Sequence, residues 1–218
     1  MDIQQKLTSF AMMGATWVMW LLIGLSVGGL AVALERAIYL IRTSDNIRRL
    51  KAEILRLLRA GDLDAARARL AQSRSVEAQV VAAGLEQDEG SASAEERMGG
   101  AAQIAKLRME KRLAFLGTLG SNAPFIGLLG TVIGIIRAFE ELNGAAGKVT
   151  AGLMSEIGEA LVATAIGILV ALPAIAFFNF FQRVIKGRLG RADAFGKEVL
   201  AVLKADEGSM RTRDRAMS

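Results

Sequence analysis

Hydrophobic positions in this chain gather into three long runs that contain no charged residue. The runs extend over residues 7–34, 113–136 and 160–182. Each is longer than the roughly 20 residues that a helix needs to cross a membrane. The first run is about twice as long as the apolar core of a signal peptide, and no small-residue cleavage pattern follows it. The pattern therefore predicts an all-α integral membrane protein with three transmembrane helices, the first of them uncleaved.

Shorter amphipathic patterns between the first and second runs predict cytoplasmic helices that extend the spans. Apolar residues recur at helical spacing over residues 50–58; we expect Gly61 to end this helix and Asp62 to cap the next. We expect a later helix to begin at Ser93 and to run unbroken into the second run. One more amphipathic helix should follow the third run, with a disordered polar tail after Asp206.

Basic residues cluster beside one end of every run. They are Arg36, Arg42, Arg48, Arg49 and Lys51 after the first run, Lys106, Arg108, Lys111 and Arg112 before the second, and Arg183, Lys186, Arg188 and Arg191 after the third. The positive-inside rule places these clusters in the cytoplasm and the N-terminus outside it. We therefore expect the basic residues to contact anionic phospholipid headgroups and not nucleic acid.

The composition excludes several kinds of chemistry. The chain has no cysteine and no histidine, which excludes disulfides, thiol nucleophiles, histidine acid–base catalysis and the usual zinc or copper sites. The sequence contains neither a Walker-type phosphate loop nor a dinucleotide-binding fingerprint. We therefore expect neither an enzyme nor a bound cofactor.

The second and third runs carry matching faces of small residues. Thr131 follows Arg112 by 19 residues and Thr164 precedes Arg183 by 19, so each lies about 28 Å of helix from the cytoplasmic charges. The stripe around Thr131 comprises Gly120, Pro124, Gly127 and Gly134, and the stripe around Thr164 comprises Ala160, Gly167 and Ala171. Such faces either pack two helices closely or line a narrow polar path.

The polar residues on these faces leave two interpretations open. A lone threonine hydroxyl in a helix usually bonds back to a carbonyl of its own helix, but a depth-matched pair favours a polar position that another group enters. Glu159 lies one turn further out, level with Arg137. It either forms a salt bridge at the outer mouth or acts as an acid that collects protons or cations. No ionisable residue lies in the middle of any run, so a proton path would need one from another chain.

The segments "GLLGTVIGIIRAFEEL" and "EIGEALVATAIGILVALPA" resemble the paired signature of the MotA/TolQ/ExbB proton-channel family. Three spans, an external N-terminus and one large cytoplasmic segment resemble the ExbB and TolQ branch, and "ALERAIYLIR" is more similar to ExbB. The resemblance implies a homopentamer in a bacterial inner membrane. Its second and third spans would line a pore around the single-span helices of an ExbD-like or TolR-like partner, which carries an essential aspartate.

By the same resemblance, Thr131 in "GTVIG" and Thr164 in "ALVATA" are pore threonines that face this aspartate, and Glu159 in "GEALVATA" is the acid of the third span. Proton flow would move the partner and drive a TonB-like effector, which opens outer-membrane transporters for iron chelates or vitamin B12. A TolA-like effector that maintains the outer membrane is the first alternative, and a gliding-motility motor is another. A non-conducting membrane scaffold is the alternative of a different class, and the missing mid-span ionisable group disfavours an autonomous channel.

The chain is thereby divided into seven predicted segments. They are a periplasmic N-terminus (1–9), a first transmembrane helix (10–34), a cytoplasmic helical domain (35–112), a second transmembrane helix (113–137), a periplasmic loop (138–155), a third transmembrane helix (156–183), and a cytoplasmic C-terminal helix and tail (184–218).

Overall fold

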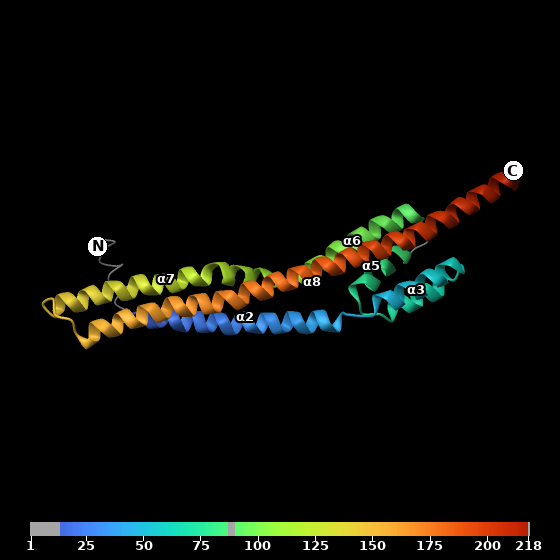
Figure 1. Cartoon of the computed structure of the whole chain (residues 1–218). Coiled ribbons are helices and arrows are strands. Elements are labelled where there is room, and N and C mark those ends of the chain that lie inside the picture. The colour runs from blue at the N-terminus through green and yellow to red at the C-terminus, as the bar shows by residue number, and fades with distance from the viewer. Residues whose placement is uncertain (1–13, 87–89, 218) are drawn as a thin grey trace. The chain divides into compact units, whose positions relative to one another are not determined.

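The computed structural model describes residues 14–86 and 90–217, and every regular element in these ranges is an α-helix. The helices are α2 (Thr16–Arg42), α3 (Ile47–Arg59), α4 (Leu63–Ala71), α5 (Val76–Leu85), α6 (Ser91–Glu110), α7 (Leu113–Gly144) and α8 (Ala151–Met217) (Figure 1). The described residues divide into two compact units. Unit 1 takes 14–35 and 112–180, and unit 2 takes 36–86, 90–111 and 181–217.

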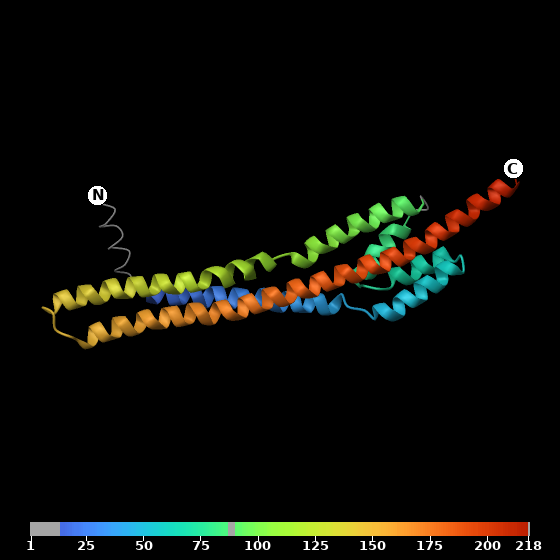
Figure 2. The ribbon, with the colours of Figure 1, turned by 45° about the horizontal axis from the view of Figure 1, so that its top comes forward.

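Unit 1 consists of the first part of α2, all of α7 and the first part of α8. α7 and α8 form an antiparallel hairpin joined by residues 145–150, and α2 lies beside them (Figures 1 and 2). Its core consists of Val18, Leu22, Leu119, Ala123, Ile133, Val170, Ala171 and Ala174. Large apolar side chains also cover the outside, since Trp20 is 69%, Phe125 68% and Leu169 68% exposed. An apolar surface of this extent requires hydrocarbon or a partner around it.

Three helices of the described chain are long and apolar enough to cross a membrane, which confirms the predicted all-α fold with three long apolar helices. The first predicted helix, 10–34, begins outside the described residues, and α2 continues beyond the predicted end to Arg42. The connection between α7 and α8 is shorter than the predicted loop 138–155, because α7 extends to Gly144 and α8 begins at Ala151.

Unit 2 consists of the end of α2, helices α3 to α6 and the later part of α8, with α5 and α6 beside α8 (Figure 2). Its core includes Leu50, Ile54, Leu58, Leu70, Val81, Phe195 and Val199. The predicted boundary at Gly61 and Asp62 is confirmed. Gly61 has φ +77°, a conformation that favours glycine, and the Asp62 carboxylate accepts the Ala65 amide at 3.0 Å.

The prediction of one unbroken helix from Ser93 into the second run is wrong. α6 begins at Ser91 and ends at Glu110, and α7 begins after Arg112, whose φ of 66° is left-handed. Side-chain contacts stabilise this break between α6 and α7, although residues 110–112 include neither glycine nor proline. Arg36 Nη1 donates to the Arg108 carbonyl at 3.0 Å near the end of α6, and Arg112 forms a 2.9 Å salt bridge with Glu35.

The C-terminal region also differs from its prediction. The expected separate helix after the third run is part of α8, which is continuous over 67 residues and includes the segment after Asp206 that was predicted to be disordered. One contact holds α8 just after Asp206. The Glu207 carboxylate accepts the Ser91 amide and, at 3.0 Å, the Ser91 hydroxyl. It thus satisfies a free amide at the N-terminus of α6 while fixing α8.

Candidate functional site

The small-residue faces of α7 and α8 bring the two backbones into contact. A Cβ atom added at Gly127 would lie 2.8 Å from the Ala163 carbonyl oxygen and 3.1 Å from the Cα atoms of Thr164 and Gly167. A Cβ atom at Gly167 would lie 2.7 Å from the Ala123 carbonyl oxygen. Backbone atoms cannot move aside as a flexible side chain can, so only glycine fits at this crossing.

The same faces meet above and below this crossing. Gly134 lies against Ala160, and Gly120 lies against Ile175. Of the seven predicted small residues other than the threonines, six are buried: Gly120, Gly127, Gly134, Ala160, Gly167 and Ala171, while Pro124 is half-buried. Within one chain these residues pack α7 on α8, which is the close-packing interpretation of the stripe.

The two threonine hydroxyls have different partners. Thr131 Oγ1 donates to the Leu128 carbonyl of its own helix at 2.6 Å. Thr164 Oγ1 donates instead across the crossing to the Gly127 carbonyl of α7 at 3.1 Å. Because Gly127 faces Thr164 and Gly134 faces Ala160, Thr131 lies level with the turn between Ala160 and Thr164. The structure thus places the two threonines at neighbouring levels of one hairpin.

The acids in the N-terminal part of α8 pair differently from the prediction. Arg137 forms its salt bridge with Glu156, at 3.0 Å, and not with Glu159. The measured register explains this correction: Gly134 packs on Ala160, so Arg137, three residues further along the antiparallel helix, lies level with residues 156 and 157. Glu159 accepts a hydrogen bond from Thr16 Oγ1 at 2.5 Å.

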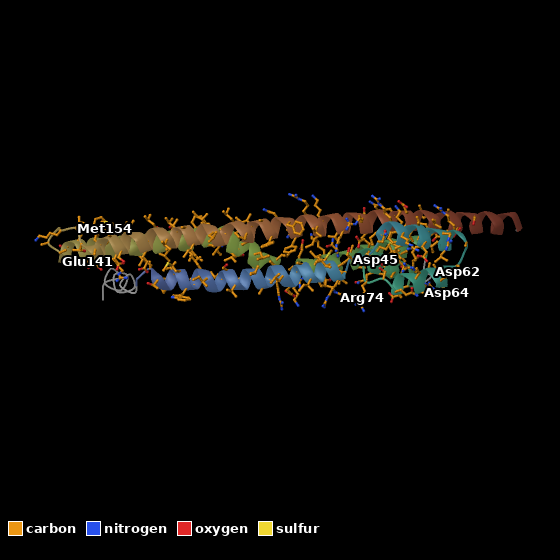
Figure 3. The ribbon with its side chains drawn as sticks, turned by 60° about the horizontal axis from the view of Figure 1, so that its bottom comes forward. Asp45, Asp62, Asp64, Arg74, Glu141 and Met154 are labelled. Atoms are coloured by element: carbon orange, nitrogen blue, oxygen red, sulfur yellow. The ribbon has the colours of Figure 1, made fainter. Side chains whose placement is uncertain are left out.

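A cavity of about 450 Å³ adjoins this salt bridge at the end of the hairpin where residues 145–150 connect α7 to α8. It is lined by Arg137, Glu140, Glu141, Gly144, Ala145 and Glu156. Glu141 of α7 and Met154 of α8 lie at this same end (Figure 3), where the Thr150 hydroxyl donates to Glu141 at 3.2 Å. The lining of this cavity therefore combines three acids with one arginine.

Two contributors to the site were absent from the sequence prediction. Thr16 comes from α2, 143 positions away from Glu159, and no local pattern connects the two residues. Gly130 lies beside the predicted stripe, and a Cβ atom there would lie 2.6 Å from the Ala163 Cβ and 3.4 Å from Val18. Gly130 could have been predicted from its spacing of three residues from Gly127 and four from Gly134, because both spacings keep residues on one helix face.

The three long apolar helices, packed through small residues, are those of an integral membrane protein. Residues 72–193 match the MotA/TolQ/ExbB proton channel family, and this region contains Thr131, Thr164 and Glu159. The chain belongs to this family, which is one of transport proteins and not of enzymes.

Curated relatives agree with this membership. A protein of Helicobacter pylori named biopolymer transport protein ExbB-like 2 is 49% identical over 78 residues, which are 36% of this chain and 52% of the relative. The biopolymer transport protein ExbB of Pseudomonas putida is 32% identical over 170 residues, 73% of this chain and 51% of the relative. The Tol-Pal system protein TolQ of Pseudomonas aeruginosa is 40% identical over 96 residues, 44% of this chain and 42% of the relative. The chain spans about half the length of these relatives.

Proposed function

We propose that this chain is a proton-channel and stator subunit of the ExbB type in a bacterial inner membrane. Five copies surround the single-span helices of an ExbD-like partner, with the N-terminus periplasmic and unit 2 cytoplasmic. Thr131, Thr164 and Glu159 line the proton pathway, and the partner supplies the mid-membrane aspartate. Proton flow then drives a TonB-like effector and, through it, outer-membrane transport.

The observation that carries the proposal is the lack of an ionisable side chain in residues 113–136 and 160–182 of a chain that belongs to a proton channel family. A proton crossing hydrocarbon requires an ionisable group on its way. These two runs make up most of the membrane-crossing parts of α7 and α8, so the group must come from another chain. A single-span partner with an aspartate meets this requirement.

The threonine geometry is compatible with such a partner. Each hydroxyl donates its one hydrogen to a backbone carbonyl, Thr131 to Leu128 and Thr164 to Gly127. The hydroxyl oxygens keep lone pairs that can accept a hydrogen bond. Each threonine can therefore accept a hydrogen bond from the O–H of a neutral carboxylic acid, which stabilises the protonated aspartate as it passes.

Valine substitutions test the proposal. Thr131→Val and Thr164→Val remove the hydroxyl at nearly constant shape and should each abolish energised transport in cells that also contain the partner. Thr118→Val, at an exposed threonine of α7, is the matched control and should keep full transport. The mass of the purified complex checks that all three variants assemble. Full transport by both assembled pathway variants would contradict the proposed pathway and would favour a non-conducting scaffold.

A TolQ-type role is the second candidate, favoured by the 40% identity to the Pseudomonas aeruginosa TolQ. The chain can be expressed in strains that lack either ExbB or TolQ. Restored growth on ferric chelates supports the ExbB role, whereas restored resistance to detergent supports the TolQ role.

A further inference from the structure

The two acids of the outer end of α8 have partners of different charge. Glu156 lies 3.0 Å from the Arg137 guanidinium. Glu159, three residues further on, accepts its hydrogen bond from the hydroxyl of Thr16, the first residue of α2. Both glutamates belong to one face of α8, yet α7 supplies a cation to one of them and α2 supplies a neutral donor to the other.

The two acids therefore differ in the kind of group that holds the carboxylate in place. A guanidinium cancels the charge of the carboxylate it pairs with, whereas a hydroxyl orients a carboxylate without cancelling its charge. The charged groups that face Glu159 are Arg137 of α7, which Glu156 already engages, and Glu156 itself on α8; Glu140 and Glu141 line the adjoining cavity. No described basic side chain lies within salt-bridge distance of Glu159.

We propose that Thr16 is a positioning residue that holds Glu159 ready to exchange protons at the outer mouth, while the Arg137–Glu156 pair only closes the hairpin. This inference rests on the proposed function, since it concerns the acid of that pathway. The Thr16 hydroxyl donates to the Glu159 carboxylate and fixes its direction.

Carbodiimide labelling tests the role of Thr16, because carbodiimides react with protonated carboxyl groups. The full-length complex in native membranes is labelled at fixed pH, and modification of the peptides containing Glu156 and Glu159 is measured by mass spectrometry. Thr16→Val should raise labelling of Glu159 severalfold, because its carboxyl group loses the hydroxyl that donates to it. Thr16→Ser, which keeps the hydroxyl, should restore the original labelling. Unchanged labelling in Thr16→Val would overturn the proposal.

A second variant tests the division between the two acids without changing Thr16. Arg137→Met should raise labelling of Glu156 and leave labelling of Glu159 within about twofold, because a hydrogen bond and a salt bridge act locally. An equal increase at both acids would show that Arg137 serves both and would overturn the division. This variant also keeps the proposal testable if Thr16→Val fails to assemble.

A transport measurement links the labelling to function. Thr16→Val should lower proton-driven transport in the original chain and have no further effect in a chain that already carries Glu159→Gln, because Thr16 acts through Glu159. Additive losses would contradict this. The labelling measurement does not depend on transport, so the two proposals can fail separately. If the Thr131→Val and Thr164→Val variants still transport, the proposed pathway is contradicted, but the labelling result for Thr16 and Glu159 still holds.

Discussion

Helices α7 and α8 of unit 1 approach each other through glycine and alanine, whereas unit 2 adds buried polar side chains to its apolar core. At the centre of unit 1, Gly127 and Gly167 place the backbones of α7 and α8 in contact. In unit 2, the buried Arg188 donates to the Leu40 and Thr43 carbonyls and to the Thr43 hydroxyl, and the buried Glu77 pairs with Arg191 at 3.0 Å.

The surroundings proposed for the two units, a membrane around unit 1 and the cytoplasm around unit 2, explain this difference. In hydrocarbon, burying an apolar side chain between helices gains little, so association depends on close van der Waals contact and small residues allow it. In water, apolar burial drives packing and the ends of short helices need partners for their free amides and carbonyls. The four helix ends near residues 42, 46, 62 and 75 all have such partners: Arg188, Asn46, Asp62 and Ser75.

The largest expected effect comes from filling the α7–α8 crossing. Gly127→Leu should prevent the folded hairpin from forming, since even its Cβ atom would lie 2.8 Å from a backbone oxygen. Gly127→Ala should destabilise unit 1 by about 1–3 kcal/mol, the usual cost of overpacking. The measurement is the yield of monodisperse protein in detergent and its thermal unfolding midpoint.

Gly24→Ala and Gly24→Leu are the matched controls, because a Cβ atom at Gly24 of α2 meets no atom within 4 Å in the chain. Both should leave the unfolding midpoint unchanged or slightly raised, since alanine and leucine favour helix over glycine. Equal losses at Gly24 and Gly127 would mean that the crossing has no special role.

The second largest effect should come from Arg188 in unit 2. Burial lowers the pKa of its guanidinium, and the acceptors at the end of α2 compensate this cost of desolvation. Arg188→Met would leave these acceptors unpaired and should destabilise unit 2 by about 3 kcal/mol. Hydrogen exchange should locate the loss at the end of α2. Lys186→Met, at an exposed position of α8, should have little effect, and an equal effect there would contradict the capping role.

The sequence predicted unit 1 better than unit 2 because its determinants are periodic. A charge-free run predicts a span by its length alone, and steps of three and four residues identified Gly120, Gly127, Gly134, Ala160 and Gly167 as members of the packed faces. The depth count was less accurate at the outer end. It paired Arg137 with Glu159, one turn away from the Glu156 that it contacts.

Contacts between residues that lie far apart in the sequence could not be predicted from such periodic patterns. Thr16 reaches Glu159 across 143 positions, and Arg188 reaches Leu40 across 148. The break between α6 and α7 has the same origin, since Arg112 is left-handed without being glycine and is stabilised by Glu35. A single sequence shows which residues have the right chemistry but not which of them meet.

A smaller effect is expected from the acid of the buried pair in unit 2. Glu77 is 2% exposed and its partner Arg191 is 55% exposed. Glu77→Gln keeps an acceptor for Arg191 and loses only the charge, so it should cost about 1 kcal/mol. Glu198→Gln is the control, because its salt bridge with Lys51 is exposed and should contribute less than about 0.5 kcal/mol. If Glu198→Gln lowered the stability measured by thermal unfolding more than Glu77→Gln does, burial would not be what makes the Glu77 pair important.

The smallest effect concerns the acid sensitivity of unit 2. Hydrogen bonds from Ser73 Oγ, at 2.6 Å, and from the Asn46 amide, at 2.7 Å, lower the pKa of Asp45 below its ordinary value of 3.8. A lowered pKa of an acid contributes stability that is present above the ordinary value and is lost as the pH falls through the lowered one. Ser73→Ala should therefore flatten the decline in unfolding midpoint of unit 2 between pH 5 and pH 3. The change at neutral pH should be well under about 1 kcal/mol, because solvent screens this exposed acid.

Asp64→Asn is the control for this pH dependence, since the side chain of Asp64 is 95% exposed and its removal should leave the decline as it is. Hydrogen exchange followed over the same pH range sharpens the contrast between the units. Residues 113–136 and 160–182 contain no titratable side chain, so Ser73→Ala should change protection in α3 to α5 and leave these two segments of unit 1 as they were. A matching change within α7 and α8 would mean that the small-residue packing of unit 1 depends on the polar contacts of unit 2.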